Sequence, residues 1–324
     1  MTGVTDTSLQ LAQGEKRPRL AGFFRRLVRE KPLGTLGAIV VLILLFSGIF
    51  ANFLAPYRMD EIHLDARLAP PSRQYLLGTD QLGRDVLSRI IYGARVSVII
   101  GLSAATLNIV VASLVGIPSG FFGGKFDLLM QRFVDAVMAF PGLLILITVM
   151  SIVGQGMVQI ILVLGIFAGI PGSRVIRSAV IGIKENLYFT AAQVIGSPST
   201  RTLSRHVVPN IMPPIIIVFT TSIGGIILAE ASLSFLGFGL PPDVPSWGGM
   251  LSGEGRRFME MAPRLALWPG LCLSVVVYGL NMFGDALRDL LDPRLRSGAG
   301  SIGGRGLKSA RRALKKRQAR ADKS

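Results

Sequence analysis

Hydrophobic residues in this 324-residue chain are grouped into long runs without a charged residue, and short polar segments separate the runs. The first run, 34–55, has 22 residues. As a helix it would be about 33 Å long at about 1.5 Å per residue, enough to cross a hydrocarbon core of about 30 Å. Runs at 96–120, 211–229 and 265–283 are also long enough to cross. The pattern predicts an all-α membrane protein.

The longest run, 136–173, has 38 residues, which is more than one pass needs. Gly154 and Gly156 lie in its middle, on either side of Gln155, and favour a turn there. We therefore predict two short spans within this run. Together with the other four runs they make a polytopic protein with six transmembrane helices.

The distribution of Lys and Arg predicts how these spans are oriented, because cytoplasmic segments carry the excess of positive charge. An even number of spans puts both termini on one side. The segments on that side carry 26 Lys and Arg residues and those on the other side carry 9. The first set comprises 1–33, 121–135, 174–210 and 285–324, and the second comprises 56–95 and 230–264. We expect an inner-membrane protein with both termini in the cytoplasm.

The formal net charge of +16 also suits a nucleic-acid-binding protein, but such proteins carry folded basic domains with aromatic side chains that stack on bases. Here the basic tail 305–323 follows a Gly/Ser-rich linker and has no aromatic residue. We predict a disordered cytoplasmic segment beside anionic membrane lipids, and no nucleic-acid partner. The first apolar run begins at Leu33 without a small-residue cleavage site after it, and we interpret it as a membrane anchor.

The sequence carries no recognisable catalytic motif. The closest approach to a phosphate-binding loop, 119–126, lacks both the first glycine and the hydroxyl residue of that motif. His63, His206 and Cys272 lie on opposite sides of the predicted membrane or inside it, which argues against a zinc site. We expect no enzyme activity, no metal and no cofactor held by this chain.

A polar segment at 190–210 interrupts the apolar pattern. Gly196 can end one short helix in a left-handed conformation, Ser197 can cap the next, and Pro198 can occupy its first position. Pro209 is expected to stop that second helix. The segment is thus predicted to form two short helices joined by a tight bend.

Side chains of the second predicted helix divide into two faces. Arg201 and Arg205 lie one turn apart, and Leu203 and Val207 lie one turn apart on a different face. A short amphipathic piece of this kind can lie along a membrane and contact another protein.

This segment resembles the cytoplasmic coupling loop of bacterial ATP-binding cassette importer permeases, in which the same residues recur at this spacing. The matching residues are Ala191, Ala192, Gly196, Arg205, His206, Pro209 and Asn210. Thr190 departs from the pattern, because the family usually has an acidic residue there. A hydroxyl group can still cap or hydrogen-bond, but it cannot form the ion pair that an acid would make with the ATPase.

The resemblance covers roughly residues 30 to 296 and is to the second permease subunit of dipeptide, oligopeptide and nickel importers. Its motifs lie at 77–89, 93–97, 135–141, 230–239, 241–248 and 281–294. It implies a type I importer permease fold. It also implies a heterodimer with a second permease subunit, two ATP-binding subunits that bind the ATP, and a periplasmic or lipid-anchored solute-binding protein.

The function implied by this resemblance is a permease subunit that forms, with its partner, the route for uptake of short peptides. Uptake of nickel or another small solute is the alternative within the family. A self-sufficient secondary transporter is a rival from another class, but it would usually carry paired ionisable groups in the membrane or an internal repeat with broken helices.

Three further features carry expectations for the structure. Glu230 ends an uncharged run near the outer boundary, so it either lines the translocation route or forms a structural bond to 231–248. Small residues four apart, at 116–120 and 165–169, are interpreted as helix packing within the chain. The outer segments 56–95 and 237–264 are expected to form an ordered docking face for the binding protein, with Trp247 at the boundary of lipid and water.

These patterns divide the chain into four parts. They are a basic cytoplasmic N-terminal segment, 1–33; the first transmembrane helix with an external loop, 34–95; a permease core with five transmembrane helices and the coupling loop, 96–290; and a basic disordered tail, 291–324.

Overall fold

The computed structural model describes residues 20–252, 256–258 and 260–291, and this part of the chain contains helices and loops but no β-strand. Its extended backbone is limited to one isolated bridge between Thr79 and Asp85. The all-α prediction is confirmed for these residues. The tail 305–323 and most of the basic N-terminal segment lie outside the described residues.

In chain order, the helices are α2 Leu20–Glu30, α3 Pro32–Ile49, α4 Ala51–Leu54, the 3-10 helix η1 Leu64–Ala66, α5 Val86–Phe122, α6 Gly124–Met138, α7 Gly142–Val153, α8 Met157–Lys184, α9 Leu187–Val194, α10 Ser199–Thr202, the π-helix η2 Leu203–Val207, α11 Val208–Asn210, α12 Met212–Phe235, α13 Trp247–Leu251 and α15 Arg264–Leu291.

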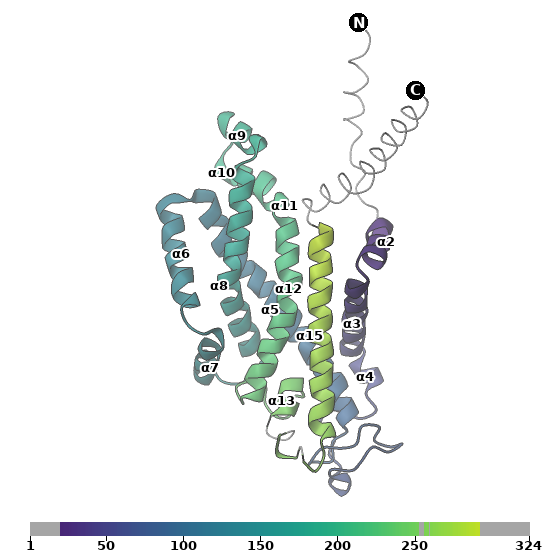
Figure 1. The fold of residues 1–324 in the computed structure, drawn as a ribbon. Coiled ribbons are helices and arrows are strands. Elements are labelled where there is room, and N and C mark those ends of the chain that lie inside the picture. The colour runs from purple at the N-terminus through teal and green to yellow at the C-terminus, as the bar shows by residue number, and fades with distance from the viewer. Residues whose placement is uncertain (1–19, 253–255, 259, 292–324) are drawn as a thin grey trace, which may run out of the picture.

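Five helices, α3, α5, α8, α12 and α15, are long and apolar enough to cross a membrane. Helices α6 and α7, which are bent by 84° at the break between them, make a sixth span when the pair is counted as one broken crossing. Counted in this way, the described part of the chain has the six predicted spans. The long helices lie alongside one another, with α9 and α10 at one end of the bundle and α13 at the other (Figure 1).

The prediction of two short spans within 136–173 is wrong in one respect. Its first half, α7, has only 12 residues, about 18 Å of helix at about 1.5 Å per residue. The segment 121–135, expected as a cytoplasmic loop, is instead largely helical, because α6 covers it from Gly124 onward. The third crossing is therefore the pair α6 and α7, joined at Pro141.

Charged residues of α6 explain why the apolar pattern missed this crossing. Arg177 of α8 donates from Nε and Nη2 to the Asp127 carboxylate of α6, at 2.6 and 2.5 Å. Arg174 of α8 likewise pairs with Asp135 of α6. Because both carboxylates of α6 have a partner on the neighbouring helix, this charged stretch can pack within the bundle.

Helices α5 and α8 also extend beyond the charge-free runs that predicted them. Helix α5 begins at Val86, ten residues before the run at 96–120. Asp85 caps it, accepting a hydrogen bond from the Ser88 backbone N–H at 2.8 Å. Helix α8 continues to Lys184, whose ammonium donates to the Phe121 carbonyl at 2.8 Å at the end of α5.

Small residues let α5 and α8 pack closely, as predicted for both pairs. A Cβ at Gly116 would lie 2.4 Å from the Ser173 carbonyl oxygen, and one at Gly120 would lie 2.8 Å from the Arg177 carbonyl oxygen. In the other direction, a Cβ at Gly169 of α8 would lie 2.8 Å from the carbonyl oxygen of α5 residue 108. The interpretation of these glycines as packing within the chain is confirmed.

The two ends of the described chain lie together. Leu27 of α2 is buried in a cluster with Ala286 and Leu290 of α15. Lys31 and Asp289 form an ion pair at 2.5 Å. Figure 1 shows α2 and the last turns of α15 at the end of the bundle where α9 projects, as an even number of crossings requires.

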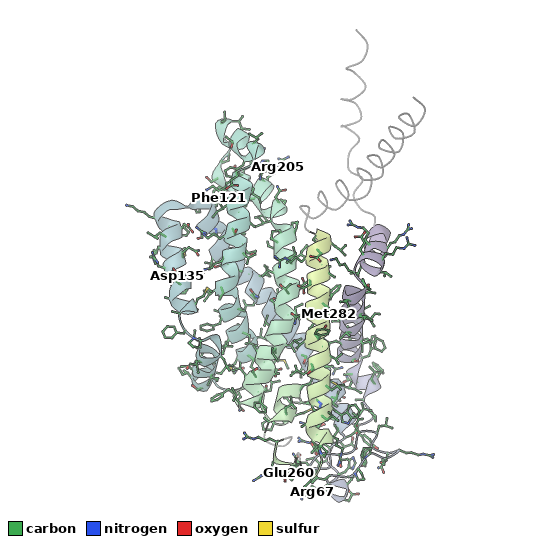
Figure 2. All side chains as sticks on the ribbon, in the orientation of Figure 1. Arg67, Phe121, Asp135, Arg205, Glu260 and Met282 are labelled. Carbon is green, nitrogen blue, oxygen red and sulfur yellow. The ribbon has the colours of Figure 1, made fainter. Side chains whose placement is uncertain are left out.

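The opposite end of the bundle is covered by residues 55–85 together with α13, which we name the loop cap. It is ordered, as expected. Asp80 and Arg84 form a buried ion pair at 2.6 Å, and Arg264 of α15 donates to the Leu68 carbonyl at 2.7 Å. Figure 2 shows Arg67 at this end.

The predicted position of Trp247 at the boundary of lipid and water is wrong. Its side chain is 3% exposed, and its indole N–H donates to the Ile90 carbonyl of α5 at 3.2 Å. Gly93 leaves room for the ring, since a Cβ there would lie 2.8 Å from the indole nitrogen. Trp247 thus fixes α13 against α5.

Candidate functional site

Residues 187–210 form a projecting segment, which contains α9, α10, η2 and α11. It extends beyond the ends of the long helices at the same end as α2 (Figure 1). Gly196 lies at the bend with φ of +72°, the left-handed conformation that the sequence indicated. The segment joins α8 directly to α12, so a displacement of its tip acts on both helices.

The tip of the projecting segment exposes large apolar side chains. Leu187, Val194 and Ile195 are 89%, 81% and 82% exposed. Exposed apolar residues gathered on a projection typically mark a surface that a partner covers. The residues that match the family motif do not include these three, although the position of Val194 and Ile195 directly before Gly196 could have revealed two of them.

The second short helix begins one residue later than expected. Pro198 has an extended backbone and precedes the helix, which starts at Ser199. The Thr202 backbone N–H donates to the Pro198 carbonyl at 3.0 Å. The prediction that Ser197 caps the helix is wrong, because its hydroxyl instead accepts a hydrogen bond from the Thr202 hydroxyl at 3.2 Å.

The prediction that Pro209 stops this helix is also wrong. Helical backbone continues through η2 and α11 and, after Ile211, into α12. A proline inside an α-helix removes one hydrogen bond and its ring clashes with the preceding turn. The π-helical turn Leu203–Val207 just before Pro209 widens the helix and removes that conflict.

The two faces of this helix are separated as predicted. Val207 is fully buried in a cluster with Phe189 of α9 and Val180 of α8, and Leu203 packs against that cluster. Arg201 and Arg205 are exposed. Figure 2 labels Arg205 on the projecting segment.

The remaining predicted residues of the coupling loop lie in the same segment. Thr190 is exposed and lies in α9 together with Ala191 and Ala192. His206 is half-buried, and its backbone carbonyl accepts a hydrogen bond from the Asn210 side-chain amide at 2.6 Å. The structure therefore brings the predicted coupling residues together in one projection.

A cavity of about 600 Å³ lies between α5, α6, α7, α8 and α12. None of the residues that line it is charged. The polar residues of the lining are Asn108, Thr221 and Ser222. Because α8 and α12 are also the helices that hold the projecting segment, movement of this segment can change the shape of the cavity.

Glu230 is not among the residues that line this cavity. Its side chain is 1% exposed, and Oε1 accepts a hydrogen bond from the Ser234 hydroxyl at 2.7 Å. The Ser246 hydroxyl is a second partner. Since Ser246 also caps α13, the carboxyl group lies in the contact between α12 and the loop cap.

Comparison with known proteins identifies the family. Residues 108–297 match the family described as the binding-protein-dependent transport system inner membrane component. Residues 19–71 match the N-terminal transmembrane domain of oligopeptide transport permease C. Together the two matches cover most of the described chain.

Full-length relatives support the same assignment. The dipeptide transport system permease protein DppC of Alkalihalophilus pseudofirmus is 36% identical over 85% of this chain and 90% of its own length. The oligopeptide transport system permease protein OppC of Bacillus subtilis is 36% identical over 83% and 88%. The glutathione transport system permease protein GsiD of Escherichia coli is 36% identical over 85% and 90%.

The fold and the projecting segment define a multi-pass inner-membrane component of a transport system. The chain belongs to the family of permeases that form the inner-membrane part of binding-protein-dependent transport systems. Proteins of this family are transporters rather than enzymes. They work with a partner permease, an ATPase and a binding protein, as the resemblance of the sequence motifs implied.

Proposed function

We propose that this chain is one of two different permease subunits that together form the route for uptake of short peptides. Two ATP-binding subunits drive the cycle, and a solute-binding protein delivers the peptide. The relatives are named for dipeptides, oligopeptides and glutathione, which favours a peptide over a nickel chelate.

The observation that carries this proposal is the projecting segment with its exposed apolar tip. An ATP-binding subunit that covers Leu187, Val194 and Ile195 would remove this apolar surface from water. Arg201 and Arg205 lie beside the tip and offer charged contacts at the rim of the same surface. Thr190 can contribute a hydrogen bond but no charge.

Coupling follows from the connections of this segment. Closure of the ATP-binding subunits displaces the tip around Gly196, and the displacement reaches α8 through α9 and α12 through η2 and α11. Val207, buried against Val180 and Phe189, makes the segment move with the end of α8. The cavity between the helices then alternates its opening.

The distribution of positive charge supports a cytoplasmic position for both termini and for the projecting segment. A reporter enzyme that is active only outside the cytoplasm should be active when fused near Ser72, in the loop cap, and inactive when fused near Ser199. The reverse pattern would contradict the orientation. On this orientation the loop cap faces outward and is the docking face for the binding protein.

The proposed substrate class is tested by uptake into cells that lack this chain. Deletion should abolish uptake of a labelled dipeptide, and a plasmid copy should restore it, while accumulation of nickel should not change. Loss of nickel accumulation with normal dipeptide uptake would assign the chain to the alternative substrate. Continued transport by this chain after removal of the ATP-binding subunits would support the rival secondary transporter.

A further inference from the structure

The face of α2 that points away from the bundle carries two arginines, Arg25 and Arg29, which we name the arginine pair. Leu27 of the same helix is buried against α15, and the two arginines lie on the opposite side, four residues apart. Both are exposed, and neither forms a hydrogen bond or an ion pair within the described part of the chain. Like charges four residues apart on a helix repel each other, so this arrangement favours an anion beside both of them.

Neighbouring charged groups are already engaged with one another. Arg26 Nε lies 3.2 Å from Glu30 Oε1, one turn along α2. Lys31 Nζ lies 2.5 Å from Asp289 Oδ2 of α15. Because these two carboxylates pair with other cations, the positive charge of the arginine pair is left for a group from outside the chain.

The packing of α2 places the arginine pair at the depth of the lipid headgroups. The Lys31 backbone N–H donates to the Leu27 carbonyl at 3.1 Å, which joins α2 to the start of α3. Arg29 lies three residues before Pro32, the first residue of this crossing, which is about 4.5 Å of helical rise at about 1.5 Å per residue. Headgroups extend a hydrocarbon core of about 30 Å to about 40–45 Å, or by about 5–7 Å on each side. The guanidinium groups can therefore reach lipid phosphates.

Exposed apolar side chains continue from the arginine pair into the membrane. Val28 of α2 is 57% exposed, and Leu33 and Leu36 in the first turns of α3 are 61% and 57% exposed. Helices α2 and α3 lie at the edge of the bundle (Figure 1). A ligand that fits this surface combines a negative charge with a long apolar part, which an anionic phospholipid has. A soluble anion would leave the apolar part uncovered, and a soluble subunit outside the membrane would not reach the leucines of α3.

We propose that the arginine pair binds the phosphate of an anionic phospholipid, with an acyl chain along the exposed side of α3. The positive charges of α2 then have two separate roles. Arg26 and Lys31 stabilise the helix and its contact with α15, and the arginine pair holds the lipid. Because α2 packs on the last turns of α15, the bound lipid stabilises this end of the bundle. The site goes beyond the proposed function and does not depend on which solute is transported.

The first test measures lipid binding to the complete importer in detergent. Added phosphatidylglycerol should raise its melting temperature in a saturable way, because a ligand that binds the folded complex stabilises it. Phosphatidylcholine with the same acyl chains and inorganic phosphate should each have a much smaller effect. Arg25→Gln together with Arg29→Gln should raise the half-saturating concentration of phosphatidylglycerol, by about fivefold for each arginine. An equal effect of phosphatidylcholine or of inorganic phosphate overturns the proposal, because the first needs no anion and the second needs no lipid.

Matched variants separate a defined site from the total charge of the chain. Lys125→Gln removes one positive charge from an exposed position on α6 and should leave the half-saturating concentration unchanged. Arg25→Lys with Arg29→Lys keeps both charges and should retain most of the binding. Arg29→Gln alone is the test if the double Gln variant does not assemble. If Lys125→Gln weakens binding as much as Arg29→Gln does, only the total charge matters and the site is refuted.

A labelling experiment tests which group covers this face in the assembled importer. In a Cys272→Ser background, Val28→Cys should react with a maleimide in phosphatidylcholine nanodiscs and more slowly in phosphatidylglycerol nanodiscs. Adding Arg25→Gln and Arg29→Gln should remove this difference, whereas a general effect of membrane charge would persist. No reaction in either lipid would show that another protein chain covers the face, and equal reaction in both would show that no lipid is held there; either result overturns the site. Neither measurement involves transport, so the lipid site and the proposed function can fail separately.

Discussion

Replacement of Gly196 by Val is the most direct test of the projecting segment as the coupling element. Gly196 has φ of +72°, a conformation that costs a non-glycine residue about 1–2 kcal/mol and more for a β-branched one. A Cβ at this position would meet no atom within 4 Å. The whole cost is therefore backbone strain, with no added steric clash.

This strain predicts a loss of coupling without a loss of insertion. A cost of about 1–2 kcal/mol lowers the population of the native bend by about 5- to 30-fold relative to alternatives. The six crossings do not depend on this bend, so the protein should reach the membrane in normal amount. Peptide uptake in proteoliposomes should fall by a similar factor, and the ATP-binding subunits should bind weakly or hydrolyse ATP without transport.

Two other glycines provide matched controls. A Cβ at Gly182, in α8, would also meet nothing within 4 Å, but its backbone is helical, so Gly182→Val should leave transport unchanged. Gly237 has φ of +87° and equally open space, but it follows α12 at the opposite end of the bundle. Gly237→Val should strain the backbone there and leave coupling to ATP hydrolysis intact. If Gly196→Val couples as well as Gly182→Val, this segment is a connector and the reasoning is refuted.

Three further predictions concern the packing that supports the site. Asp80→Asn should destabilise the loop cap by about 3 kcal/mol or more, because it removes the charge of a buried carboxylate that pairs with Arg84 and also lies within ion-pair distance of Arg89; limited proteolysis of the outer face would measure this, and unchanged cleavage would contradict it. Glu230→Gln should preserve transport and thermal stability, since an amide oxygen can still accept a hydrogen bond from the Ser234 hydroxyl. Loss of transport in this variant would indicate that the carboxylate lines the translocation route. Gly116→Val should lower the melting temperature of the complex much more than Gly182→Val, because its side chain meets the backbone of α8.

The sequence alone was sufficient for features that belong to a single segment. Five crossings, α3, α5, α8, α12 and α15, follow from the lengths of the apolar runs, and the bend at Gly196 follows from the freedom of glycine to adopt a positive φ. The close packing at Gly116 and Gly120 follows from the absence of side chains. Each of these features depends on local geometry, which neighbouring residues already determine.

Other features were decided only when distant segments met. From the sequence, a carboxylate such as Asp127 is expected in a loop. In the structure Arg177, fifty positions away, pairs with it, and this pairing allows α6 to pack as half of a broken crossing. From the sequence, Trp247 is expected at the boundary of lipid and water. In the structure its indole N–H donates to the Ile90 carbonyl inside the bundle.

Asn108 illustrates the same limit between α5 and α8. In the sequence it is one polar residue within an apolar run, and only the approach of α8 at Gly172 shows that its amide oxygen is buried in the contact between the two helices. The environment of a charge or an amide depends on groups that folding brings from elsewhere in the chain, because desolvation and pairing act through space rather than along the sequence. The apolar pattern therefore determined the five single-helix crossings, and tertiary packing determined the broken one and where polar groups can lie between the helices.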